Sequence, residues 1–250
     1  MATPWTIAAE WVGKTCFIVA GGPSAADAGV ARLAPDAAAP RTSIGSAADG
    51  KRKVIAINSS YVIAPFADIL FFADERWWRG EPDRGIVGHR DRKEFQAFAA
   101  GVSLRPIGRP EAIPPMAPLL VTTSPHVHDD RVLRLRRGPP PGLAEDRSTV
   151  TLCWTSVTAA INIAVHLGVV RIVLIGVDGG PGPAPDCRTH HHEPHPWPAR
   201  TENWGKQAAD LVSLAGPLAT RGIIVLNACP DSAIFCWPRM TLTDALTVIR

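Results

Sequence analysis

Residues 154–180, WTSVTAAINIAVHLGVVRIVLIGVDGG, determine the fold class predicted for this chain. Thr155 or Ser156 can cap a helix, because a hydroxyl at that position accepts hydrogen bonds from free backbone N–H groups. Apolar residues then recur at helical spacing as far as Gly168, a residue type that commonly ends helices. The β-branched run at 169–177 is typical of a strand buried on both faces of a parallel sheet.

Asp178 follows this strand directly and is the first candidate for a functional residue. In open α/β sheets, ligands bind beyond the carboxyl ends of the strands. Polar residues or glycines also follow the strands predicted at residues 16–20, 53–57, 67–73 and 223–226. The residues at these strand ends are Gly21, Gly22, Asn58, Asp74, Asp178 and Asn227. If all these strands end at one edge of a sheet, the residues after them should form a single cleft.

The alternation of strands and helices predicts a Rossmann-like α/β fold, with a mostly parallel sheet and helices on both faces. The chain has 250 residues, 46% of them hydrophobic, which is enough to bury a sizeable core. We expect a single nucleotide-binding domain over residues 1–250, in which residues 84–149 form a lid or a variable insertion. The net charge of +3 is too small to indicate a nucleic-acid partner by itself.

The sequence predicts a cytoplasmic protein without a membrane partner. No segment reaches 18 continuous apolar residues, and the N-terminus lacks a basic region followed by an apolar one. The five cysteines show no CxxC spacing, and their odd number suggests reduced thiols.

Residues 21–24, Gly-Gly-Pro-Ser, lie between a predicted strand and a helix predicted over 25–33, with Ser24 as its cap. A strand, a glycine-rich turn and a helix can point backbone N–H groups at an anion such as phosphate. The turn is neither GxGxxG nor a P-loop, since the spacing differs and lysine is absent. The alternative is a tight turn that uses glycine only for its backbone freedom.

A long proline-rich loop at 181–200 carries a cluster of histidines: His190, His191, His192 and His195. Imidazole is a common zinc ligand. However, consecutive histidines do not easily face one ion, and the chain has no HExxH frame, so no metal site is predicted. A histidine with a near-neutral pKa can instead act as a general base or contact substrate. A solvated histidine-rich loop without function is the third interpretation.

Residues 131–137, RVLRLRR, alternate in a way that predicts one strand with its arginines on a shared face. Such a basic surface can bind the phosphates of nucleic acid. Charge also protects an edge strand from mispairing, which is the alternative interpretation. DNA contact is therefore predicted only through Arg131, Arg134, Arg136 and Arg137.

Several segments taken together resemble one superfamily: FIVAGGPS, VIAINSS, ADILFFAD, TSVTAAINIAVHLG with RIVLIGVDGG, the histidine loop, and LNACPDS. The superfamily contains the bacterial sialyltransferases and the archaeal 6-hydroxymethylpterin diphosphokinase-like proteins, and phages carry proteins with this pattern. The resemblance spans residues 16–246 and is weakest across 84–149. Tyr61 is the only tyrosine, so the tyrosines that assist the leaving phosphate in sialyltransferases have no clear counterpart.

The resemblance implies a nucleotide-binding domain in which residues 21–24 (Gly21, Gly22, Pro23, Ser24) line the phosphate region. It also implies that Asn58 and Ser156 contact the donor. Position after the predicted strands adds Ser59, Asp74, Asn227 and Ser232 to the donor-binding set. In sialyltransferases a histidine of this loop is the general base. That role falls here to His190, His191, His192 or His195, with Asp178 as the remaining candidate.

The leading hypothesis is a transferase with a nucleotide-linked donor, most simply a glycosyltransferase. A loop histidine would deprotonate an acceptor hydroxyl, while N–H groups near Gly22 and Ser156 would stabilise the leaving phosphate. The acceptor would be a small sugar or a hydroxymethylated base in phage DNA. The first alternative is an ATP-dependent diphosphokinase with Mg²⁺ held by Asp74 and Asp178. The second is a non-catalytic, nucleotide-binding phage accessory protein.

Overall fold

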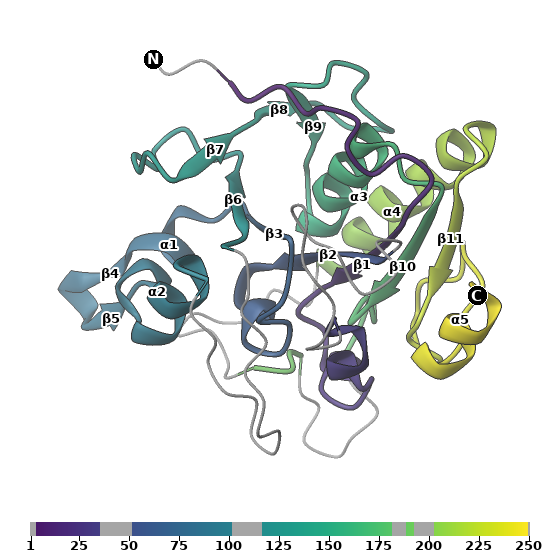
Figure 1. Ribbon diagram of the computed structural model, residues 1–250, viewed down its shortest axis with the longest axis horizontal. Coiled ribbons are helices and arrows are strands. Elements are labelled where there is room, and N and C mark those ends of the chain that lie inside the picture. Colours follow the sequence, from purple (N-terminus) through teal and green to yellow (C-terminus); the bar gives the residue numbers. More distant parts are fainter. Residues whose placement is uncertain (1–3, 36–51, 102–116, 182–188, 193–202, 250) are drawn as a thin grey trace.

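The computed structural model describes residues 4–35, 52–101, 117–181, 189–192 and 203–249 (Figure 1). Its centre is a seven-stranded parallel sheet with the spatial order β11-β10-β1-β2-β3-β6-β7. The strands are β1 (Thr15–Val19), β2 (Arg52–Ile57), β3 (Ile69–Phe72), β6 (Leu119–Thr122), β7 (Val132–Arg134), β10 (Arg171–Ile175) and β11 (Ile224–Asn227). The predicted α/β class with a mostly parallel sheet is confirmed.

The order of the strands reverses beside β1. From β1 the chain adds β2, β3, β6 and β7 on one side, and then places β10 and β11 on the other. β1 pairs with β10 along its whole length, from Thr15 with Arg171 to Val19 with Ile175. Ligands of open α/β sheets bind at such a switch point, in the crevice beyond the carboxyl ends of the two strands.

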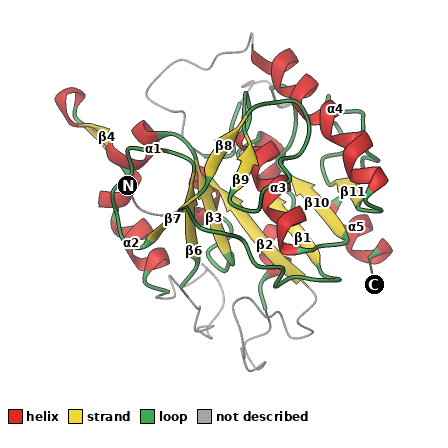
Figure 2. Ribbon diagram, turned by 90° about the horizontal axis from the view of Figure 1, so that it is seen from above, coloured by secondary structure: helices red, strands yellow, loops and turns green. Residues whose placement is uncertain are grey.

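Helices cover both faces of the sheet. In Figures 1 and 2, α1 and α2 lie towards the β6–β7 edge, and α4 and α5 lie towards β10 and β11. The helices are α1 (Glu75–Arg79), α2 (Lys93–Ala99), α3 (Ser156–Leu167), α4 (Trp204–Thr220) and α5 (Leu242–Val248). Two small sheets pair β4 (Gly80–Glu81) with β5 (Ile86–Val87), and β8 (Arg136–Gly138) with β9 (Thr149–Thr151).

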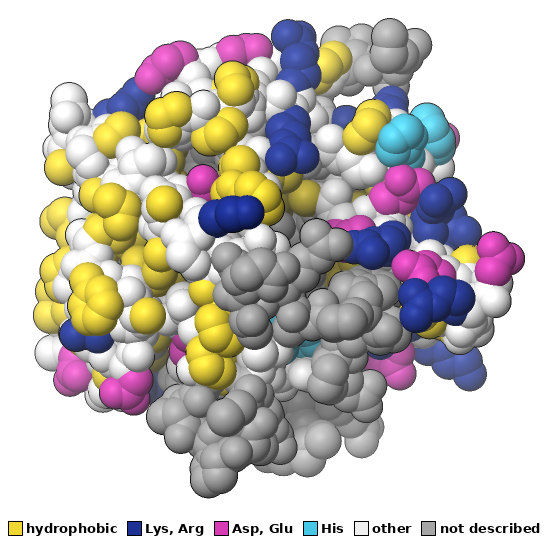
Figure 3. All heavy atoms as spheres, turned by 180° about the vertical axis from the view of Figure 1, so that it is seen from behind, with side chains coloured by type: hydrophobic (Ala, Val, Ile, Leu, Met, Phe, Trp, Pro, Cys, Tyr) yellow, Lys and Arg dark blue, Asp and Glu magenta, His cyan; other side chains and the backbone are white. Residues whose placement is uncertain are grey.

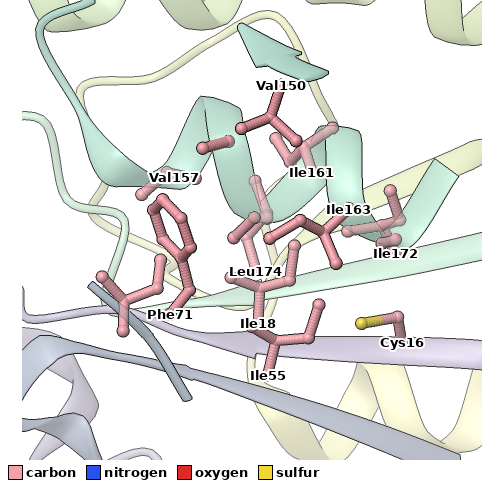
Figure 4. Close-up of a cluster of buried hydrophobic side chains, with 14 of the residues drawn as sticks. Cys16, Ile18, Ile55, Phe71, Val150, Val157, Ile161, Ile163, Ile172 and Leu174 are labelled. Carbon is pink, nitrogen blue, oxygen red and sulfur yellow. The ribbon is translucent and has the colours of Figure 1, made fainter. Parts of the chain in front are cut away.

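Alternate residues of each strand enter two separate cores. Cys16 and Ile18 of β1 face α3 and α4, whereas Phe17 and Val19 face α1, α2 and α5. Figure 4 shows the first of these cores, where strand side chains such as Leu174 meet residues of α3. Because neighbouring strand residues point to opposite faces and both faces are covered, the strands read as continuous apolar runs.

Helix α3 forms as its sequence predicts. The Thr155 hydroxyl accepts a hydrogen bond from the Val157 N–H at 3.3 Å, which identifies Thr155 rather than Ser156 as the cap. Gly168 ends the helix with φ of 90°, a left-handed conformation that favours glycine. Ser156 is consequently the first residue of α3, at the carboxyl edge of the sheet.

The helix predicted over 25–33 is wrong. Two short 3-10 turns, Pro23–Ala25 and Val30–Leu33, take its place, and Gly29 between them has φ of 73°. Ser24 caps neither turn, because it lies inside the first one; its hydroxyl donates to the Cys229 Sγ at 3.1 Å. A left-handed residue interrupts helical hydrogen bonding, so the segment does not continue as one helix.

The single strand predicted at 131–137 is also wrong, because its two halves pair with different sheets. Leu135 N donates to Thr122 O at 2.9 Å, whereas Arg136 N donates to Ser148 O at 2.8 Å. β7 is the edge strand of the main sheet, and β8 belongs to the small sheet with β9. The arginines therefore do not share one strand face.

Within residues 84–149, β6 and β7 extend the main sheet. The loop between β8 and β9 is also anchored, since Ala144 N donates to Asn162 Oδ1 of α3 at 2.8 Å. Within the described ranges, no helix has the length and apolar character needed to cross a membrane.

Candidate functional site

A cavity of about 590 Å³ lies at the carboxyl ends of β1 and β10, where the strand order reverses. We call it the switch-point cavity. Residues after four of the predicted strands meet in its lining, which confirms that these strand ends form one cleft. The predicted site residues that line it are Gly21, Gly22, Asn58, Asp74, Ser156, Asp178, His190 and His192.

Gly22 and Asp178 are in very close contact across the two strand ends. A Cβ atom on Gly22 would lie 2.0 Å from Asp178 Oδ2 and 2.4 Å from Gly176 O, so only glycine fits. The sequence predicted that the N–H groups of this turn bind phosphate. The Gly22 N–H instead donates to Gly176 O at 2.9 Å and is therefore not available to a phosphate. Ser24 of the same turn lowers the pKa of the Asp178 carboxyl, against the effect of burial. This turn thus holds a carboxylate of the protein itself.

The surroundings of the Asp178 carboxyl raise its pKa and leave one of its oxygens without a hydrogen-bond donor. Burial raises its pKa, hydrogen bonds from Ser24 oppose this, and the charge of Asp231 adds to it. Asp178 Oδ2 is buried and has no hydrogen-bond partner among the residues that the structure describes. A buried, unpartnered oxygen is costly in a folded protein, and Asp178 lines the cavity, so this residue is a candidate for contact with a ligand that donates hydrogen bonds.

Asn58 also lines the cavity and carries a second unpartnered oxygen. Within the described ranges it is the sole non-glycine residue with positive φ, at 51°, and its Oδ1 is buried without a partner. It begins a 3-10 turn, Asn58–Val62, directly after β2. Asparagine tolerates the left-handed region better than most residues, and strained backbone is concentrated at functional sites. The unpartnered acceptors of Asn58 and Asp178 together indicate a ligand rich in hydrogen-bond donors.

The histidine segment is anchored on the other strand ends through His191. Its N–H donates to Gly21 O at 3.0 Å, and its Nε2 lies 3.1 Å from Ser60 Oγ. This holds the rings of His190 and His192, whose centroids are 5.0 Å apart, against the cavity. His191 does not line it, and His195 lies outside the described residues.

The first two histidines are neutral at physiological pH. Burial, followed by the charge of His192, lowers the pKa of His190 to about 4. Burial and the charges of His192 and His190 lower the pKa of His191 to about 4 as well. Both imidazoles can therefore donate or accept hydrogen bonds without carrying charge.

Helices α3 and α4 form the opposite wall. Ser156 lies at the N-terminus of α3, where unpaired N–H groups and the helix dipole favour an anion. Trp154 is 43% exposed, and Lys206 Nζ of α4 lies 4.1 Å from its ring centroid. Sequence reasoning missed Trp154, Trp204 and Gln207, all of which line the cavity. The only local signal for them was that Trp154 directly precedes the cap of α3.

The remaining predicted donor-binding residues support the site from outside the cavity lining. Asn227 is fully buried and donates to Val177 O at 3.2 Å, and Ser232 Oγ donates to the same oxygen at 2.7 Å. Ser59 is buried and accepts from Trp77 Nε1 at 3.0 Å. Pro23 and Ser24 also do not line the cavity. Asn227 and Ser232 thus fix the backbone that carries Asp178.

Asp74 lines the cavity and caps α1, since its carboxylate accepts from Arg76 N at 2.8 Å. It was expected to hold Mg²⁺ with Asp178 under the diphosphokinase alternative. Across the part of the chain that the structure describes, no group of three or more His, Cys, Asp or Glu side chains is arranged to hold a metal ion.

Comparisons of this chain with protein-family models, with curated proteins and with solved structures found no match. The fold and the site define the class of protein: a Rossmann-like α/β protein with a polar cavity at the switch point of its sheet.

Proposed function

We propose that this protein is a transferase that binds a nucleotide-linked donor, such as a nucleotide sugar, in the switch-point cavity. The observation that carries the proposal is that Asn58 and Asp178, each with an unpartnered side-chain oxygen, line one cavity together with the N-terminus of α3. The oxygens require hydrogen-bond donors, which sugar hydroxyls supply. The helix N-terminus favours an anion, which the donor's phosphate supplies. A nucleotide sugar carries both groups side by side.

Asp178 is the general base in this proposal, in place of a loop histidine. A base works best when its pKa is near the working pH. Burial moves the carboxyl of Asp178 towards that range and moves His190 away from it, to about 4. His190, which is neutral at that pH, then contacts the substrate through hydrogen bonds.

The reaction follows from these positions. Asp178 Oδ2 accepts the proton of the acceptor hydroxyl as the hydroxyl oxygen forms a bond to the donor's anomeric carbon. The bond from that carbon to the phosphate oxygen breaks, and the nucleotide leaves with the electron pair. The Ser156 hydroxyl and the N–H groups of the first turn of α3 stabilise the charge that develops on the phosphate.

A thermal-shift panel of CMP, UDP, GDP and ATP, each with and without Mg²⁺, tests the binding step. We expect at least one pyrimidine or guanine nucleotide to raise Tm without a metal requirement, since ligand binding stabilises the native state. A shift with ATP alone that depends on Mg²⁺ would favour the diphosphokinase alternative. No shift with any nucleotide would overturn the proposal.

Two substitutions separate binding from chemistry. The same assay is then run with a nucleotide sugar that carries the base that binds. Asn58→Gly removes the amide yet suits a positive φ, so it should abolish the shift with this nucleotide sugar without unfolding the chain. Asp178→Asn should retain the shift but lower slow hydrolysis of the donor about a hundredfold or more. Val62→Ala, on the same turn as Asn58 but 59% exposed, is the matched control and should change neither measurement.

A further inference from the structure

A second cleft, of about 1120 Å³, adjoins the switch-point cavity. Asp74, Trp154, Thr155 and Ser156 line both, so ligands in the two spaces would meet at this shared wall. Three arginines also line this second cleft, which we call the arginine cleft: Arg134, Arg136 and Arg137.

These arginines carry positive charge that is little compensated. The Arg134 guanidinium has no hydrogen-bond or ion-pair partner among the residues described, and Arg137 donates to two backbone carbonyls, Leu152 O at 2.7 Å and Cys153 O at 3.5 Å. Arg136 lies 3.6 Å from Asp146, but both side chains are more than half exposed. Such exposed ion pairs contribute little to stability, so Arg136 can leave Asp146 and bind a ligand instead.

Two acidic residues, Asp74 and Glu75, line the cleft beside the three arginines, so positive charge exceeds negative charge there by one. Each carboxylate also faces an arginine of α1. Asp74 lies 3.6 Å from Arg76, and Glu75 lies 2.6 Å from Arg79 on the next turn of α1. On the face shown in Figure 3, basic and acidic side chains are interspersed. The arginine cleft therefore has an excess of positive charge beside a cavity whose own unpartnered atoms are hydrogen-bond acceptors.

We infer that the arginine cleft binds the phosphate group of the acceptor, which is therefore a phosphate ester. This inference rests on the proposed transfer function. The guanidinium fork matches the oxygens of phosphate, and the exposed indole of Trp154 on the shared wall can stack on the acceptor's base or sugar. An acceptor anchored in this way extends its hydroxyl across Ser156 towards Asp178. A free phosphorylated metabolite and a phosphodiester of a nucleic-acid strand share this chemistry.

Binding measurements by calorimetry test the inference with three probes: a sugar phosphate, the same sugar without phosphate, and a short single-stranded oligonucleotide. We expect at least one phosphate-bearing probe to bind and the neutral sugar not to bind. Binding of the sugar phosphate identifies a metabolite as the source, and binding of the oligonucleotide alone identifies nucleic acid. Equal binding of the neutral sugar, or no binding of any probe, would overturn the inference.

Arginine substitutions locate the binding. Arg134→Gln should lower the affinity for the phosphate-bearing probe about tenfold, and Arg134→Lys should recover part of this loss. Arg131→Gln is the matched control, because Arg131 is paired with Asp129 at 2.8 Å and lies outside the cleft. If both glutamine variants weaken binding equally, the cleft is not the site.

The nucleotide panel, repeated on Arg134→Gln, separates this inference from the proposed function. We expect the nucleotide shift to be unchanged, because Arg134 does not line the switch-point cavity. If no nucleotide binds to any form while the phosphate probe still depends on Arg134, the proposed donor site fails and the anion site stands. Circular dichroism melting of each variant verifies that it is folded.

Discussion

The switch-point cavity and the arginine cleft share a wall but are built by different forces. In the cavity, glycines allow backbone and carboxylate to approach closely, and burial raises the pKa of Asp178 and lowers that of His190. In the cleft, exposed guanidinium groups provide charge with little burial. Polar groups in the cavity are therefore sensitive to geometry and pH, whereas those in the cleft are sensitive to salt. This difference suits a space that performs chemistry beside one that holds a charged substrate.

The largest effect expected is from Gly22→Ala, which places a methyl group against Asp178 Oδ2 and Gly176 O. One clash is with backbone, so the ends of β1 and β10 must separate. We expect a loss of about 3 kcal/mol or more in the free energy of unfolding, measured with urea. Gly180→Ala is the control, because Gly180 lines the same cavity with no atom within 4 Å of its added Cβ. Equal stability of the two variants would contradict the close contact.

An intermediate effect is expected from pH. Because the pKa of His190 and of His191 is lowered to about 4 from 6.5, the native state binds fewer protons than the unfolded state between these values. Stability is therefore present above pH 6.5 and is lost as the pH falls towards 4. We expect the pair to account for a fall of about 5 °C in Tm over this window.

The double variant His190→Gln/His191→Gln should flatten this part of the profile. The control is His128→Gln, at an exposed histidine of the arginine cleft, which should leave the dependence of Tm on pH unchanged. Asp178 contributes with the opposite sign, because its raised pKa costs stability as the pH rises through that pKa. An unaltered decline in the double variant would show that these histidines are not buried as described.

The smallest effects are expected in the arginine cleft. Arg136→Gln should change the free energy of unfolding by less than about 0.5 kcal/mol, because its pair with Asp146 is exposed. Arg137→Gln should cost about 1 kcal/mol, because it removes hydrogen bonds to Leu152 O and Cys153 O. Urea denaturation of both variants measures the difference. A larger loss for Arg136→Gln would mean that the cleft is held together by ion pairs rather than open to an anion.

The sequence by itself determined the sheet class, most strands, helix α3 and the edge at which the site lies. These follow from signals within a few residues: the Thr155 cap, the Gly168 end and the apolar run before Asp178. Four of the five predicted strand ends meet in one cavity for a related reason, since parallel strands present their carboxyl ends at one edge. Asn227 is the exception, because its side chain turns inward to Val177 O.

Only the tertiary structure decided what each polar group faces. The sequence predicted that the N–H groups after β1 bind phosphate. In the structure the Gly22 N–H donates to Gly176 O, and the turn lies against Asp178, which follows another strand. Likewise, alternation at 131–137 predicted one strand, but the hydrogen bonds of Leu135 and Arg136 go to different elements. Cavity residues from α4 gave no sequence signal at all. The physical reason is the same in each case: local sequence fixes the conformational preference of a segment, whereas its burial and its hydrogen-bond partners depend on residues distant in the chain.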